Sequence, residues 1–163
     1  MLLVPVVYVK FYKKKSIRKE LGFEKFEVKK FLKNSLLVFA TLLVYSMLLS
    51  ILFFITKTND FGTVEETAKG IAIASPIIII YLLGVKVFCE ELFFRAFLVP
   101  KIGIIGASVA FGIAHIGYGS IGQVIGAIIL GIILSIAYNQ NRSIYSNYTA
   151  HALYNIITIL MVA

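Results

Sequence analysis

Residues 35–56, SLLVFATLLVYSMLLSILFFIT, contain no charged side chain and are followed by Lys57. About 20 consecutive apolar residues are enough to cross the hydrocarbon core of a bilayer as a helix, so this stretch predicts a transmembrane helix. The whole chain agrees, because 60% of its 163 residues are hydrophobic and only 15% are charged, with a mean hydropathy of +0.92. Soluble domains usually carry about 25% charged residues, so the composition argues against a water-soluble globule.

The basic residues are concentrated on one side of this apolar stretch. Ten of the sixteen Lys and Arg residues fall within residues 10–33 together with three glutamates, so this short segment carries +7 of the net charge of +8. Cytoplasmic flanks of transmembrane helices are enriched in Lys and Arg. We therefore expect a cytoplasmic segment over 10–33 that attracts anionic lipid. We expect no nucleic-acid binding, which needs basic residues along a folded polar face.

The remaining apolar sequence predicts four more membrane helices, over residues 77–99, 103–116, 121–139 and 143–163. Pro100 is expected to stop the first of them, because proline interrupts a helix. The glycine-rich turn GYGSIG at 117–122 separates the second from the third. Residues 57–70 are expected to form an external loop.

These elements predict an all-α fold, a polytopic membrane helix bundle of about five transmembrane helices. Residues 1–163 form one integral membrane domain, with the basic cytoplasmic segment at 10–33 and a motif-bearing core at 77–160. The apolar start, MLLVPVVYV, covers only about 14 Å as a helix at roughly 1.5 Å per residue. We interpret it as the truncated remnant of a first span. Cys89 is alone, so no disulfide can form within one chain.

Six ionisable side chains fall inside the predicted spans: Lys86, Glu90, Glu91, Arg95, His115 and His151. An unpaired charge there costs about 3 kcal/mol or more. Each alone has a structural explanation, because a Glu and a Lys or Arg at i, i+4 can pair within one helix and a lone His can hydrogen-bond a neighbouring helix. Glu90, His115 and His151, however, share a depth of roughly 13 to 21 Å from the cytoplasmic boundary at about 1.5 Å per residue. This shared depth predicts one polar site inside the membrane.

The local spacing separates the roles of these groups. Glu91 and Arg95 are four residues apart and share a helix face, whereas Glu90 is turned by about 100°. Arg95 can therefore neutralise one carboxylate and leave the other to take a proton from water. His151 and Asn155 also lie one helical turn apart, and both can donate hydrogen bonds to a developing oxyanion.

Three motifs carry a resemblance to a known family: EELFFR at 90–95, FGIAH at 111–115 and HALYN at 151–155. In this order, on successive apolar helices, they resemble the motifs of the type II CAAX prenyl endopeptidase and bacteriocin-processing family of intramembrane glutamate proteases. The resemblance covers about residues 77–160. It implies a helix bundle around a cavity open to the cytoplasm and to lipid. It also implies hydrolysis of a peptide bond in a membrane-associated, prenylated CAAX-type protein, with release of a C-terminal tripeptide.

The resemblance also implies roles for individual residues. Glu90 would be the general base that activates water, and His115 would hold or polarise that water. His151 and Asn155 would stabilise the oxyanion. Three further residues would support the site: Glu91, Arg95 and, through packing, Phe111.

The sequence leaves alternatives open for both the cofactor and the function. One Glu and two His could hold zinc as a three-ligand site; we expect no metal, because no HExxH pair is present and Asn155 suits hydrogen-bond donation. The chain could instead be a non-catalytic membrane scaffold or bacteriocin immunity factor, or a carrier that relays protons through Glu90, His115 and His151. The expected partners are membrane lipid and a prenylated or other membrane-associated protein. The oligomeric state is not predicted.

Overall fold

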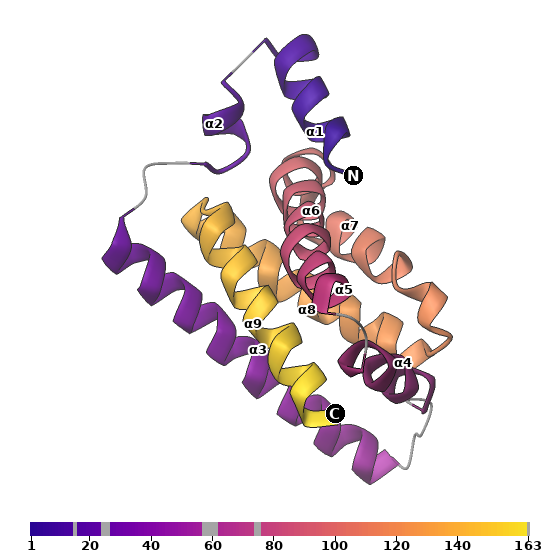
Figure 1. Ribbon diagram of the computed structural model, residues 1–163. Coiled ribbons are helices and arrows are strands. Elements are labelled where there is room, and N and C mark those ends of the chain that lie inside the picture. The colour runs from indigo at the N-terminus through magenta and orange to yellow at the C-terminus, as the bar shows by residue number, and fades with distance from the viewer. Residues whose placement is uncertain (15, 24–26, 57–61, 74–75, 163) are drawn as a thin grey trace.

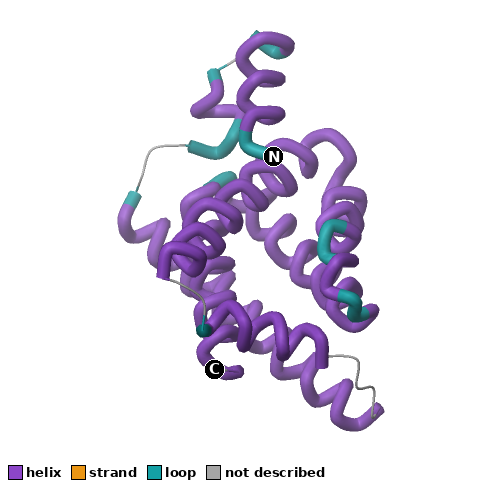
Figure 2. The backbone as a smooth tube through the Cα atoms, turned by 45° about the vertical axis from the view of Figure 1, so that its right-hand side comes forward, coloured by secondary structure: helices purple, strands orange, loops and turns teal. Residues whose placement is uncertain are grey.

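The computed structural model describes residues 1–14, 16–23, 27–56, 62–73 and 76–162. Over these ranges the secondary structure is helical, with short turns and no strand (Figure 1 and Figure 2). The prediction of an all-α bundle is confirmed. The helices follow the predicted spans, but their ends differ from the predicted ones.

Long helices form the body of the bundle. In chain order they are α3 (Val28–Thr56), the helical run α5 (Pro76–Ile80), η2 (Tyr81–Lys86), α6 (Val87–Glu90) and η3 (Glu91–Leu98), then α7 (Val99–Ile113), α8 (Ile121–Asn141) and α9 (Ile144–Val162). The segments η2 and η3 are π-helical, and a short 3₁₀ turn, η4 (Ile116–Tyr118), lies between α7 and α8. α3 packs along α9, and α7 packs against α8 (Figure 1).

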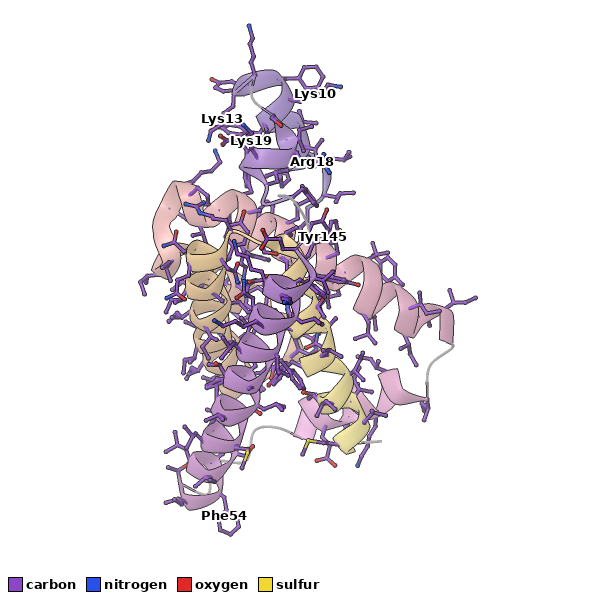
Figure 3. All side chains as sticks on the ribbon, turned by 90° about the vertical axis from the view of Figure 1, so that its left-hand side faces the viewer. Lys10, Lys13, Arg18, Lys19, Phe54 and Tyr145 are labelled. Carbon is purple, nitrogen blue, oxygen red and sulfur yellow. The ribbon has the colours of Figure 1, made fainter. Side chains whose placement is uncertain are left out.

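The surface of α3 has the character expected of a helix in lipid. α3 and α8 are the two helices, among the described residues, that are long and apolar enough to cross a membrane. Large apolar side chains on α3 are exposed, and Phe54 near its end is 85% exposed. Figure 3 shows Phe54 at one end of the molecule and Lys10, Lys13, Arg18 and Lys19 at the opposite end.

The basic segment folds onto the end of the bundle. It contributes α1 (Leu3–Val7), η1 (Tyr8–Tyr12) and α2 (Ile17–Glu20), and its last lysines belong to the first turns of α3. Val9 and Leu21 are buried beside Tyr138 and Ile144. Gly22 has φ +76°, and a Cβ there would lie 2.8 Å from the Tyr138 hydroxyl. Its carbonyl oxygen accepts a hydrogen bond from the Ile144 N–H at 3.2 Å. The segment is therefore anchored where α8 joins α9.

Two boundaries differ from the predicted ones. α4 (Gly62–Ala72) is a helix where the sequence predicts a loop over 57–70; residues 57–61 of that loop lie outside the described residues. Its Glu65 and Lys69 pair at 2.7 Å with i, i+4 spacing, which supports helix formation.

The second difference is at Pro100, which does not stop the helix. Helical backbone continues from η3 through Leu98 into α7, so Pro100 lies inside one helical run, close to its end. The chain turns instead at Gly103, whose φ of +76° and ψ of 174° suit glycine. Beyond Gly103, α7 ends at Ile113 after about 15 Å at roughly 1.5 Å per residue, half the thickness of a hydrocarbon core. His115 follows this short helix and therefore lies inside the bundle.

Small residues let α7 and α8 approach each other closely. A Cβ on Gly131 would lie 3.2 Å from the Cα of Ser108, and the Ser108 and Ser135 hydroxyl oxygens are 3.4 Å apart. The spacing of Gly131 and Ser135 predicts such a face. The structure confirms it and shows that α7 packs on it.

Gly112 lies at a very close approach between α7 and α8, so a substitution there tests this contact. A Cβ there would overlap Cγ1 of Ile128 and lie 2.9 Å from the Val124 carbonyl oxygen. We expect Gly112→Ala to lower the thermal unfolding temperature in detergent, because α7 and α8 would have to separate at a cost of about 1–3 kcal/mol. Gly70→Ala on α4 is the control, since nothing lies within 4 Å of its Cβ position. Equal melting of wild type and Gly112→Ala would contradict the close approach.

Candidate functional site

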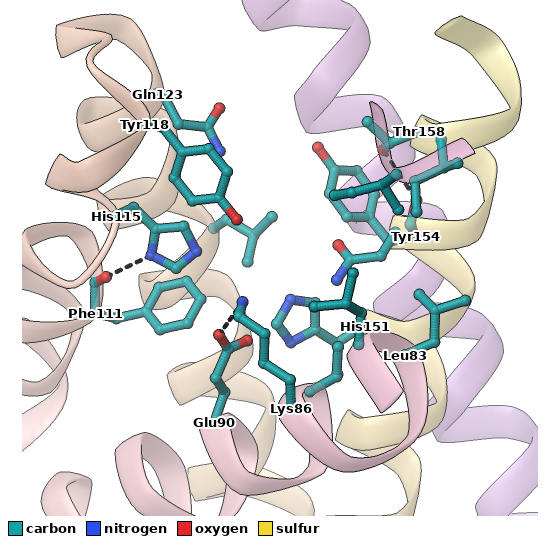
Figure 4. A pocket seen from close by; sticks show the side chains of 16 residues that line it. Leu83, Lys86, Glu90, Phe111, His115, Tyr118, Gln123, His151, Tyr154 and Thr158 are labelled. Carbon is teal, nitrogen blue, oxygen red and sulfur yellow. Dashed lines mark hydrogen bonds and ion pairs between the residues drawn. The ribbon is translucent and has the colours of Figure 1, made fainter. Parts of the chain in front are cut away.

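A pocket of about 190 Å³ lies among the helices that carry the three sequence motifs (Figure 4). Apolar side chains form part of its wall. The polar side chains in the wall are Lys86, Glu90, His115, Tyr118, Gln123, His151, Tyr154, Asn155 and Thr158. The four residues to which the sequence assigns chemistry, Glu90, His115, His151 and Asn155, therefore meet at one pocket. Figure 4 shows the two histidines on opposite sides of it.

Each of the three motifs reaches the pocket from a different element. Glu90 is the last residue of α6, with the π-helical segments η2 and η3 on either side. π-helical turns are rare and frequently occur at functional sites. His115 follows the end of α7, and His151 lies in α9. Tertiary packing, not a local loop, thus assembles the site.

Glu91 does not line the pocket; it is fully buried and bonds to His151 from behind it. The Glu91 Oε1 is 2.9 Å from the His151 Nδ1. A carboxylate can only accept a hydrogen bond, so Nδ1 of His151 carries a proton and donates it. This contact fixes the orientation of the ring and leaves Nε2 as the nitrogen that can act in the pocket.

Arg95 is also fully buried and forms the predicted pair with Glu91. Its Nη1 lies 3.4 Å from the Glu91 Oε1, and the pair has the i, i+4 spacing. The guanidinium carbon is 4.1 Å from the centroid of the Phe111 ring. Arg95 therefore balances the charge of Glu91, and the aromatic face adds a cation–π contact. The structure adds His151 to this predicted pair.

Asn147 is a buried site residue that the sequence reasoning missed. Its Nδ2 donates to the Leu134 carbonyl oxygen at 2.7 Å and to the Glu91 Oε2 at 3.4 Å. It thereby holds the second carboxylate oxygen of Glu91. The signal was available in α9, because Asn147, His151 and Asn155 repeat every four residues and so share one face.

Lys86 forms the i, i+4 pair that the sequence offers as a structural explanation, and this pair changes the expectation for Glu90. The sequence predicts that Glu90 is left for chemistry, but the Lys86 ammonium donates to the Glu90 Oε1 at 2.6 Å (Figure 4). The Glu90 side chain is only 7% exposed, whereas that of Lys86 is 40% exposed. Both carboxylates of the EE pair therefore have their own cation, each four residues away. The i, i+4 spacing of Lys86 and Glu90 was the signal for this pair.

His115 is held in a similar way to His151. Its Nδ1 is 2.8 Å from the Phe111 carbonyl oxygen, which can only accept, so Nδ1–H is the donor. The ring stacks on Tyr118 with centroids 5.7 Å apart and an interplanar angle of 15°. Both histidines thus use Nδ1 for a structural contact and keep Nε2 for other partners.

The described part of the chain contains no group of three His, Cys, Asp or Glu side chains that could hold a metal ion together. The polar side chains around the pocket include one carboxylate, two imidazoles and two amides. Such a set can accept a proton from water and donate hydrogen bonds to an oxyanion.

The fold and the pocket define a helical membrane protein with a buried polar site. A family model described as type II CAAX prenyl endopeptidase, Rce1-like, matches residues 72–157, just over half of the chain. The chain belongs to this family, a family of CAAX-type intramembrane proteases, and the resemblance indicated by the motifs is confirmed. The matched range includes all four residues to which the sequence assigns chemistry. Neither the curated proteins nor the solved structures include a match.

The buried charges behind the pocket give a test of stability. We expect Arg95→Met to destabilise the protein strongly, by about 3–5 kcal/mol, because it leaves Glu91 charged and buried without its cation. The double variant Arg95→Met/Glu91→Gln removes both charges and should recover a large part of this loss. Thermal unfolding of the single and double variants in one detergent measures the coupling. Additive losses in the double variant would contradict the pairing.

Proposed function

We propose that this protein is an intramembrane endopeptidase that hydrolyses a peptide bond of a prenylated, CAAX-type substrate by means of water activated by Glu90. The observation that carries the proposal is the meeting of Glu90, His115, His151 and Asn155 at one pocket, within the part of the chain that matches the family. A glutamate-dependent hydrolase needs a base, a group that holds the water and donors for the oxyanion. These four side chains supply all three.

In the proposed mechanism Glu90 accepts a proton from a water molecule that is held with the help of His115. The resulting hydroxide attacks the carbonyl carbon of the scissile peptide bond, and the carbonyl oxygen takes up the negative charge. Asn155 Nδ2 and His151 Nε2 donate hydrogen bonds to this oxyanion. Glu90 then passes its proton to the leaving amine as the carbon–nitrogen bond breaks.

Glu91 acts in this scheme as a positioning residue. An imidazolium donates through both ring nitrogens, so His151 can bond Glu91 through Nδ1 and the oxyanion through Nε2. The carboxylate of Glu91 offsets the positive charge that this requires. Arg95 and Asn147 in turn hold that carboxylate in place.

We further propose that the substrate approaches from the cytoplasm and from the lipid. Four basic residues, Lys10, Lys13, Arg18 and Lys19, lie together at one end of the molecule (Figure 3), and Lys and Arg are enriched at the cytoplasmic ends of membrane helices. The apolar side chains exposed on the helices suit contact with lipid and with a prenyl chain.

The proposal predicts cleavage of a farnesylated peptide that ends in a CAAX sequence. We expect the purified protein in detergent to release the C-terminal tripeptide, detected by mass spectrometry. Glu90→Gln should lower the rate by about 10²–10⁴ because it removes the general base, and Asn155→Ala should lower kcat by about 10²–10³. Glu66→Gln, on the exposed surface of α4, serves as the matched control and should keep the wild-type rate. Turnover by Glu90→Gln at the wild-type rate would refute Glu90 as the base.

The proposed reaction uses no metal ion. We therefore expect the membrane-permeant chelator 1,10-phenanthroline to leave the cleavage rate unchanged, because Glu90 activates water directly. A non-chelating isomer, 1,7-phenanthroline, controls for effects on the detergent micelle. Loss of activity with the chelator alone, followed by recovery on addition of zinc, would establish a zinc site instead.

A further inference from the structure

Lys86 is the one Lys or Arg side chain among the described residues that line the pocket. It lies one helical turn before Glu90, and Figure 4 shows its amine pointing into the pocket near Glu90 and His151. Its side chain is 40% exposed, so it is open to a molecule that enters the pocket. Arg95 carries the other nearby positive charge, but it is fully buried and paired with Glu91.

The ion pair with Glu90 occupies one oxygen of the proposed base. Lys86 donates to the Glu90 Oε1 at 2.6 Å, so the pair has to open before this oxygen can take the proton of a water molecule. When the pair opens, the ammonium of the partly buried Lys86 side chain has no anion beside it. A buried charge without a partner costs free energy. A second anion in the pocket would compensate Lys86 while Glu90 acts as the base.

The proposed substrate brings such an anion. A CAAX sequence is the C-terminus of its protein, so the three residues beyond the scissile bond end in a free carboxylate. In an extended conformation they span about 10 Å. The Cα of Lys86 is displaced from that of Glu90 by about 6 Å along the helix, at roughly 1.5 Å per residue, and its flexible four-carbon stem can swing further along the pocket.

We propose that Lys86 binds the terminal carboxylate of the substrate and thereby releases Glu90 for the water step. This assignment rests on the proposed function, because it requires a substrate cut near its C-terminus. Lys86 becomes a specificity-determining residue that distinguishes a chain end from an internal peptide segment. Without substrate, the same side chain keeps Glu90 paired.

The experiment measures binding separately from cleavage. A fluorescent farnesylated CAAX peptide is prepared as the free acid and as the C-terminal amide, and its affinity for the full-length Glu90→Gln variant in detergent is measured by anisotropy. We expect the acid to bind about tenfold more tightly than the amide, as suits one charge-assisted hydrogen bond. Adding Lys86→Met should remove this preference, and adding Lys86→Arg should retain it.

Lys69→Met in the same Glu90→Gln background is the matched control. Lys69 forms an i, i+4 pair with Glu65 at 2.7 Å, but both side chains are 55% exposed and neither lines the pocket. This control should keep the preference for the acid. The Glu90→Gln/Lys86→Met protein has neither charge of the ion pair, so no unpaired charge remains in the pocket. Its affinity for the amide peptide verifies that it is folded.

The outcomes separate the two proposals. Equal affinity of Glu90→Gln for acid and amide, or an acid preference that survives Lys86→Met, would overturn the role of Lys86. Cleavage by the wild-type protein is measured with the same two peptides. If the acid preference depends on Lys86 but the wild-type protein cuts neither peptide, the carboxylate site stands and the proposed proteolysis is contradicted.

Discussion

The buried carboxylate of Glu91 is the constraint on which the site depends. It is fully removed from water, so it must be balanced by positive charge and by hydrogen bonds. Arg95 supplies the charge from the same helical run, and His151 and Asn147 supply the hydrogen bonds from α9. The same contacts join η3 to α9 and set the orientation of a pocket residue. The stability of the bundle and the geometry of its pocket therefore rest on one cluster.

Two adjacent glutamates serve different purposes because consecutive residues of a helix point in different directions. Glu91 turns into the protein, and Glu90 turns into the pocket. Their cations lie on opposite sides in sequence, Lys86 four residues before Glu90 and Arg95 four residues after Glu91. Each pair is thus confined to its own helix face. If both pairs lay on one helix face, a single cation could interact with both carboxylates, because charges interact strongly in a low-dielectric interior.

The sequence predicts the parts of this structure that depend on composition and helical spacing. The apolar spans, the Glu91–Arg95 pair and the face shared by Gly131 and Ser135 all follow from counting along the chain. Contacts between helices do not, because no periodicity states which residue of α9 faces Glu91. Asn147 was missed although its spacing from His151 places it on the same face of α9, and its contact with Glu91 depends on how α9 packs against η3. The break after the first motif helix was also predicted too early, at Pro100, whereas the helical run continues to Gly103, where φ is positive.

Phe111 links the buried cation behind the pocket to the two pocket histidines. Its ring centroid is 4.1 Å from the guanidinium carbon of Arg95, and it is 4.5 Å and 6.0 Å from the ring centroids of His115 and His151. The ring therefore has the buried cation and the two pocket histidines as neighbours. An aromatic ring can attract a cation through its face without offering it a charge to pair with. A flexible polar side chain at this position would offer Arg95 an alternative partner and weaken its hold on Glu91, and Glu91 is the residue that orients the His151 ring.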